Sequence, residues 1–147
     1  MTFYLLRRKL ISKLAMAKSK APSIHEIEKQ LKQKKLLPVY YLFGEDSYSI
    51  ETSLEAIEKT VSPFITSDFD KEVLYGENQT FAGIAGLAST FPFGSEKKLI
   101  IVKQAEKLKD KKEFVSYLKS PSDFSILLFL HEGTILNTES EPYKTLA

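Results

Sequence analysis

Three short and strongly apolar runs constrain the fold of this chain more than any other feature. They are Val39–Phe43, Leu99–Val102 and Phe124–Leu130, and stretches with the apolar spacing of helices separate them. A strand that is apolar at nearly every position is buried on both faces, as in a parallel sheet covered by helices. The sequence therefore predicts a three-layer α/β/α fold with a mostly parallel sheet.

Cap residues and apolar spacing place the helices between these runs. The expected helices are Ser23–Leu37, Asp46 or Ser47 to Lys59, Thr80–Ala88, Asp110–Leu118 and Ser140–Leu146. A short alternating segment, Asp70–Tyr75, is expected to add a further strand. The last expected helix stops close to Ala147, so the chain is interpreted as a fragment of a longer one.

The N-terminal residues differ from the rest in charge. The formal net charge is +2, but the first 20 residues carry six Lys and Arg and no acid, so residues 21–147 carry a formal −4. A domain that bound nucleic acid through its phosphates would be basic. Residues 1–21 are interpreted as a basic leader that is either disordered or upstream of a true start at Met16.

Composition excludes several kinds of site. The chain has no Cys and only two His, His25 and His131, so thiolate metal sites, cysteine nucleophiles and His-rich centres are not expected. No apolar run approaches 18 residues, so no transmembrane helix is expected. Lys97-Lys98 and the group Lys107, Lys109, Lys111 and Lys112 alternate with acids and are interpreted as solvated faces.

The segment Gly44–Ser49 lies where mononucleotide-binding folds place a phosphate loop. It has one Gly and no Lys, and Glu45 and Asp46 put negative charge where phosphates would sit. A phospho-acceptor domain would need an Asp after a later strand, but Leu99–Val102 is followed by Lys103. Helix capping by Asp46 or Ser47 is the stronger interpretation, and no catalytic, metal-binding, nucleotide-binding or cofactor residue is predicted.

Phe91 and Phe93 flank Pro92 in the loop before the second apolar run. Connecting loops are usually polar because they face water. Two phenylalanines there either fill the core or anchor a partner protein. Full burial of both rings would indicate core filling, and exposure of at least one would indicate an anchor.

Two segments carry a resemblance to a known family. The sequence Tyr41–Asp46, followed by a helix with Ile50 and Glu51, resembles the N-terminal domain of the delta subunit of the bacterial DNA polymerase III clamp loader. The segment Pro92–Leu108 is similar to the family's apolar-Phe pair, its following strand and its basic helix start. The resemblance covers residues 22–147.

The resemblance implies a RecA-like or AAA+-like fold without a P-loop and without catalysis of its own, with residues 22–147 as the first domain of a longer chain. Such a sheet places Val39–Phe43 centrally, so if its next neighbour lies beyond Ala147, one edge of this strand is expected to be unpaired. It implies that Phe93, with Pro92 and Phe91, binds the DNA polymerase sliding clamp and helps to open it during DNA replication. Many members have Leu or a similar residue where this chain has Pro92, so both Phe91 and Phe93 remain candidates for the main anchor.

The further partners implied are the other clamp-loader subunits, through the region beyond residue 147, and DNA only within the assembled complex. No membrane is implied, and the implied location is cytoplasmic. The alternatives are an unrelated α/β interaction domain or a nucleotide-binding α/β enzyme.

Overall fold

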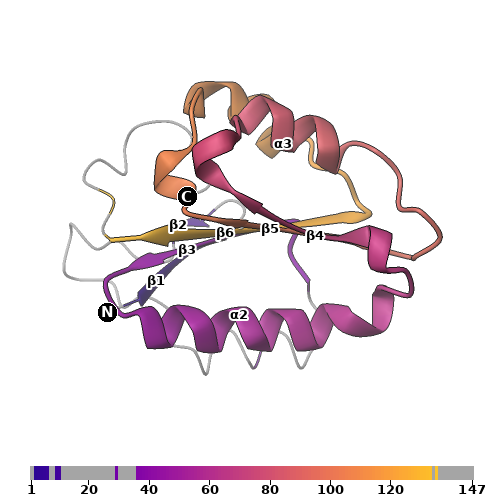
Figure 1. Ribbon diagram of the computed structural model, residues 1–147, viewed down its shortest axis with the longest axis horizontal. Helices are drawn as coiled ribbons and strands as arrows, with labels where there is room; N and C mark the ends of the chain where they lie inside the picture. Colours follow the sequence, from indigo (N-terminus) through magenta and orange to yellow (C-terminus); the bar gives the residue numbers. More distant parts are fainter. Residues whose placement is uncertain (1, 7–8, 11–28, 30–35, 134, 136–147) are drawn as a thin grey trace.

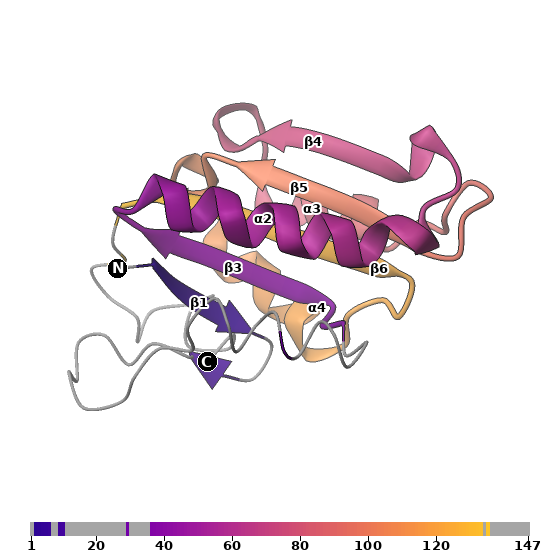
Figure 2. The same cartoon turned by 90° about the horizontal axis from the view of Figure 1, so that it is seen from below.

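The computed structural model describes residues 2–6, 9–10, 29, 36–133 and 135, which form a three-layer α/β fold (Figure 1). Among these residues six strands make one sheet in the order β2-β1-β3-β6-β5-β4. The strands are Thr2–Leu6 (β1), Lys9–Leu10 (β2), Val39–Gly44 (β3), Lys71–Tyr75 (β4), Lys98–Lys103 (β5) and Ser125–Glu132 (β6). The pairs β3–β6, β6–β5 and β5–β4 are all parallel, as predicted (Figure 2).

The parallel strands β3, β5 and β6 are buried on both faces, which explains their continuous apolar runs, whereas the edge strand β4 is alternately exposed. Alternate side chains of each strand point to opposite faces, so Tyr40 and Leu42 enter one core while Tyr41 and Phe43 enter the other. One core lies under helix α2 (Ser47–Val61), and the other lies under α3 (Phe81–Ala88) and α4 (Val115–Lys119). Figure 1 shows α2 on one side of the sheet and α3 on the other.

The predicted caps begin the two longer helices. The Asp46 carboxylate accepts a hydrogen bond from the backbone N–H of Ser49 at 3.3 Å, and the Thr80 hydroxyl accepts one from Gly83 at 3.0 Å. Each side chain satisfies an N–H group that has no partner within its helix. Short 3₁₀ helices connect the larger elements at Ser62–Phe64, Asp68–Asp70, Gly76–Asn78, Ala105–Lys107 and Lys111–Phe114.

One expected helix is interrupted in the structure, and two others lie largely outside the described residues. The segment expected as one helix over Asp110–Leu118 is a 3₁₀ helix followed by the short α4, and Asp110 precedes it with φ 59° in the left-handed region. That expectation was therefore only partly right. The expected helices Ser23–Leu37 and Ser140–Leu146 lie outside the described residues, except for Lys29, which is helical, and Leu36–Leu37.

The edge of β3 corrects another expectation. β1 pairs antiparallel along β3, with Phe3 opposite Phe43 and Leu5 opposite Tyr41. The expected unpaired edge at Val39–Phe43 was therefore wrong. Residues 2–6 and 9–10 of the proposed leader are strands, whereas 1, 7–8 and 11–21 lie outside the described residues. The start at Met16 and the domain limits 1–21 and 22–147 stay predictions.

Candidate functional site

The loop between α3 and β5 presents Phe91 and Phe93 to solvent. Phe91 is 80% exposed and Phe93 is 77% exposed. Large apolar side chains that gather on a surface mark candidate contact sites. The interpretation in which these rings fill the core is therefore wrong. Pro92 between them is half-buried.

Each exposed ring has an aromatic neighbour from another loop. Phe93 meets Phe69 nearly edge-on, with ring centroids 5.9 Å apart, and Phe91 lies against Phe124 with centroids 4.8 Å apart. Phe69 is itself 76% exposed, whereas Phe124 is half-buried. Two small aromatic pairs therefore form, and we call Phe69, Phe91, Phe93 and Phe124 the aromatic surface.

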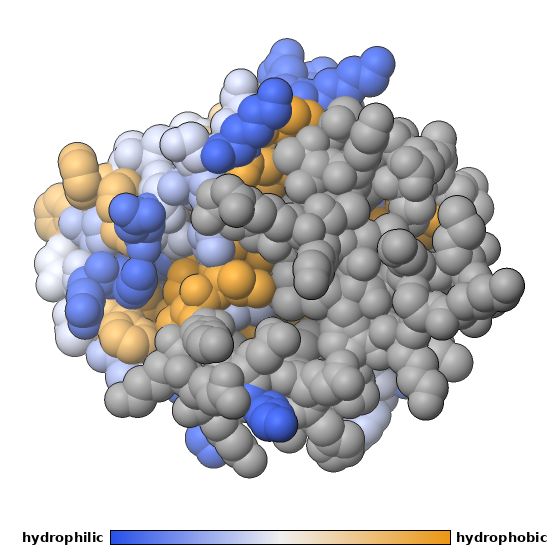
Figure 3. All heavy atoms as spheres, turned by 180° about the vertical axis from the view of Figure 1, so that it is seen from behind, coloured by the Kyte–Doolittle hydropathy of each residue, from blue (hydrophilic) through white to orange (hydrophobic). Residues whose placement is uncertain are grey.

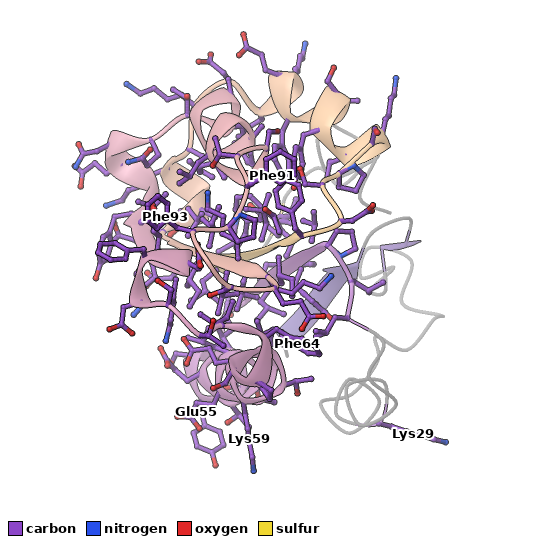
Figure 4. The ribbon with its side chains drawn as sticks, turned by 90° about the vertical axis from the view of Figure 1, so that its right-hand side faces the viewer. Lys29, Glu55, Lys59, Phe64, Phe91 and Phe93 are labelled. Carbon is purple, nitrogen blue, oxygen red and sulfur yellow. The ribbon has the colours of Figure 1, made fainter. Side chains whose placement is uncertain are left out.

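The aromatic surface lies at the amino ends of the parallel strands. Phe69 immediately precedes Asp70 and β4, the loop with Phe91 and Phe93 precedes β5, and Phe124 precedes β6. Figure 4 looks at this side of the molecule, with Phe91 and Phe93 above the end-on helix that carries Glu55 and Lys59. Hydrophobic atoms reach the surface on the same side, at the left of Figure 3. Ligand crevices of open α/β sheets lie at the opposite, carboxyl ends.

Asp70, which immediately precedes β4, binds the middle of the loop that carries Phe91 and Phe93. Only 1% of this residue is exposed, and its two carboxylate oxygens accept hydrogen bonds from the backbone N–H groups of Phe93 and Ser95, the second at 2.9 Å. Burial would raise the pKa of Asp70, but these hydrogen bonds and the positive charge of Lys98 together hold the pKa below its ordinary value. The carboxylate is therefore ionised at neutral pH.

Ser95 fastens the end of the loop to the segment before β4. Its hydroxyl oxygen accepts hydrogen bonds from the backbone N–H groups of Thr66 and Ser67, each at 2.9 Å. The same two segments are also joined by the N–H of Lys97, which donates to the carbonyl of Phe64 at 3.1 Å. These contacts join the loop that carries Phe93 to the loop that carries Phe69.

Lys98 fastens the start of the loop, where α3 ends. Its ammonium group donates to the carbonyl of Leu87 at 2.8 Å and to the hydroxyl of Thr90 at 2.6 Å. A cation at the C-terminus of a helix satisfies free carbonyl groups and opposes the negative end of the dipole. Lys98 is only 5% exposed, so its interpretation as part of a solvated face was wrong. Lys107, Lys109 and Lys112 are exposed as expected, and Lys97 and Lys111 are partly exposed.

The carboxyl end of β3 has a different character. The N–H of Gly44 donates to the carbonyl of Gly133 at 2.9 Å, and the N–H of Gly133 donates back to Gly44 at 2.9 Å. The Asp46 carboxylate occupies the first turn of α2, where hydrogen bonds from Ser49 lower its pKa. Two N–H groups of this segment, those of Gly44 and Ser49, are therefore engaged with the protein itself and not free to bind a phosphate.

Histidine and carboxylate side chains do not gather into a metal site within the described part of the chain. His131 is buried, and its Nδ1 lies 2.7 Å from the hydroxyl of Tyr41. Within the same residues, no helix is long and apolar enough to cross a membrane.

The sequence singled out Phe91, Pro92 and Phe93 as candidates but gave no sign of Phe69, Asp70 and Phe124, which the structure places beside them. Asp70 was predicted only as the first residue of a strand, because nothing in the local pattern links it to a loop more than twenty residues later. A buried acid just before an edge strand can be recognised only once the strand pairing places it beside Lys98.

Comparisons with known proteins agree on one family. Residues 40–147 match the family model described as DNA polymerase III, delta subunit. DNA polymerase III subunit delta of Bacillus subtilis is 32% identical over 73% of this chain and 34% of its own length. The solved structure of the Bacillus subtilis DNA clamp loader delta protein superposes with a TM-score of 0.70 at 26% identity, over 84% of this chain and 39% of that chain. The chain thus spans little more than a third of these relatives.

Proposed function

This chain belongs to the DNA polymerase III delta subunit family, and on that premise we propose that it binds the DNA polymerase sliding clamp through the aromatic surface. Phe93 is the main anchor, with Phe91 and Pro92 beside it. The domain contributes binding, and no catalytic step, to the opening of the clamp during DNA replication.

The observation that supports this proposal is the exposure of Phe93 on a loop that hydrogen bonds hold in place. A Phe side chain that enters an apolar pocket contributes roughly 1.5–3 kcal/mol at full burial, and aromatic anchors of this kind dominate many interfaces. Asp70, Ser95 and Lys98 already hold the loop in one shape. Little conformational entropy is then lost when the loop docks.

The surroundings of the rings suit a protein partner. Glu96 is exposed and Ser95 and Lys97 are partly exposed, so polar groups border the apolar centre. An apolar centre with a polar border is the usual anatomy of a protein interface. Lys98 does not belong to this border, because it is buried beneath the loop.

Nucleotide chemistry is the less favoured function for this chain. At the carboxyl end of β3, Glu45 and Asp46 bring negative charge to the position that polyphosphate would occupy, and Asp46 caps α2. A phosphate site needs free N–H groups and a cation at that position. The domain is therefore proposed to act without a bound nucleotide.

The wider role follows from the family. We propose that the part of the protein beyond residue 147 joins the other clamp-loader subunits, and that contact with DNA occurs only in the assembled complex. A subunit of the replication machinery acts in the cytoplasm of a bacterium, which is the proposed location.

Chemical-shift mapping tests the proposed site directly. Purified sliding clamp is added to the isotope-labelled protein, and the backbone amide signals are compared before and after. The signals of Phe69, Phe93 and their neighbours in the loops at residues 64–70 and 89–97 are expected to shift or broaden first. Changes centred on Glu45–Ser49, at the opposite end of the strands, would contradict the proposed site.

A further inference from the structure

Asp70 is a buried charged residue whose two carboxylate oxygens serve the loop of Phe93. We propose that Asp70 is a positioning residue for clamp binding: its carboxylate fixes the backbone on both sides of Gly94 and so sets the direction in which Phe93 projects. This inference rests on the function proposed above, because the bound partner is the same sliding clamp.

The backbone around Gly94 presents two converging N–H groups that an anion can bind. The N–H groups of Phe93 and Ser95, which are two residues apart, converge on one carboxylate, and Gly94 between them has a positive φ of 108°. Backbone N–H groups that converge in this way form an anion-binding concavity. Here the anion is the protein's own side chain, so the position of Asp70 immediately before β4 dictates the shape of the loop.

The charge of Asp70 is balanced from the neighbouring strand. The parallel register sets Lys71 opposite Leu99, so Asp70 and Lys98 occupy adjacent positions at the amino ends of β4 and β5. Lys98 in turn holds the end of α3 through Leu87 and Thr90. A buried charge is stable only when it is paired and hydrogen-bonded. Asp70 therefore connects the start of the loop, through Lys98, with its apolar tip.

The isosteric substitution Asp70→Asn tests whether the charge and the hydrogen bonds of Asp70, and not only its volume, shape the loop. In Asp70→Asn the side chain keeps its size, but its amide can accept from only one of the two N–H groups, and its NH₂ group faces the other donor. The negative charge next to Lys98 is lost as well. The loop then loses one of its two central hydrogen bonds while the aromatic rings themselves stay unchanged.

The experiment compares Asp70→Asn with Asp68→Asn, a matched loss of charge at an exposed position of the same 3₁₀ helix. Affinity for purified sliding clamp is measured by titration calorimetry, and the amide proton shifts of Phe93 and Ser95 are recorded for each variant. We expect Asp70→Asn to weaken binding by about tenfold, the lower end of the value of a hydrogen bond to a charged group, and to move both amide signals. Asp68→Asn should leave affinity and both signals as they are.

A double variant identifies the residue through which Asp70 acts. If Asp70 positions Phe93, adding Asp70→Asn to Phe93→Ala should weaken binding no further, because the two changes remove the same contact. Additive losses would overturn the proposal. Unchanged Phe93 and Ser95 amide signals in Asp70→Asn would also overturn it.

The spectra of the unchanged protein provide a test that does not depend on the variant folding. The amide signals of Phe93 and Ser95 should shift with acid at the pKa of Asp70, below the ordinary value of 3.8, and signals that do not follow this titration would contradict the hydrogen bonds. If the signals titrate but Phe93→Ala binds the clamp normally, the proposed function fails while the geometry of the loop stands.

Discussion

Phe69 and Phe93 belong to different loops, yet their rings meet nearly edge-on with centroids 5.9 Å apart. An edge-to-face pair contributes about 0.5–1.5 kcal/mol beyond the area that it buries. We therefore expect Phe69→Ala to lower the affinity for the sliding clamp by about two- to tenfold, less than the loss of Phe93 itself. Calorimetric titration measures this, with Tyr75→Ala as the control for removing an exposed ring on β4. Equal affinities of the two variants would show that Phe69 has no part in binding.

Phe81 and Phe93 should respond in opposite ways to the same substitution. Phe81 is fully buried and packs against Phe114 and Phe129, with centroids 5.0 and 5.6 Å away. Phe81→Ala is expected to lower the free energy of unfolding by about 3–5 kcal/mol, whereas Phe93→Ala should lower it by no more than about 1.5 kcal/mol, because the exposed ring loses only its edge-to-face pair with Phe69. Urea denaturation measures both. A loss of stability in Phe93→Ala as large as that in Phe81→Ala would show that Phe93 is part of the core.

Acid should weaken the contribution of Asp70 to stability. Because hydrogen bonds and Lys98 lower the pKa of Asp70 in the folded protein, its ionised form stabilises the fold at every pH well above 3.8. The stabilisation is lost as the pH falls below 3.8 and through the lower pKa of the folded state. The difference in free energy of unfolding between the unchanged protein and Asp70→Asn should therefore shrink in this acidic range. A difference that stays constant down to the lowest pH measured contradicts the role of the charge.

Mg-ATP should not bind to this domain. The N–H of Gly44 is bonded to Gly133, and the Asp46 carboxylate occupies the first turn of α2. Phosphate would have to displace these groups and approach the carboxylates of Glu45 and Asp46. Isothermal titration with Mg-ATP is expected to give no heat of binding at micromolar concentrations. A saturable signal in that range would refute the assignment of this end of the sheet.

The parallel core could be predicted from the sequence because its signal is local. Val39–Phe43, Leu99–Val102 and the run ending at Leu130 are apolar at almost every position, and only strands covered on both faces have that pattern. Asp46 and Thr80 likewise act on N–H groups three residues away. Features that depend on nearby residues can therefore be predicted from the sequence.

The support of the site could not be predicted, because it depends on contacts between distant segments. Asp70 reaches Phe93 and Ser95, and Lys98 reaches the end of α3, only after β4 and β5 have paired. Lys98 looks like one of several surface lysines in the sequence, since burial of a lysine depends on partners that the local pattern does not reveal. The pairing of β1 with β3 was missed for the same reason.

Clamp affinity of Phe93→Ala, compared with Tyr48→Ala, tests the central claim most directly. Tyr48 is 79% exposed but lies on the first turn of α2, at the opposite end of the strands from Phe93. Both variants remove one exposed ring, and neither should change the melting temperature appreciably. We predict that Phe93→Ala weakens binding to purified sliding clamp by about tenfold or more, as expected for a central aromatic anchor, while Tyr48→Ala binds like the unchanged protein. Unaltered affinity of Phe93→Ala would contradict the account.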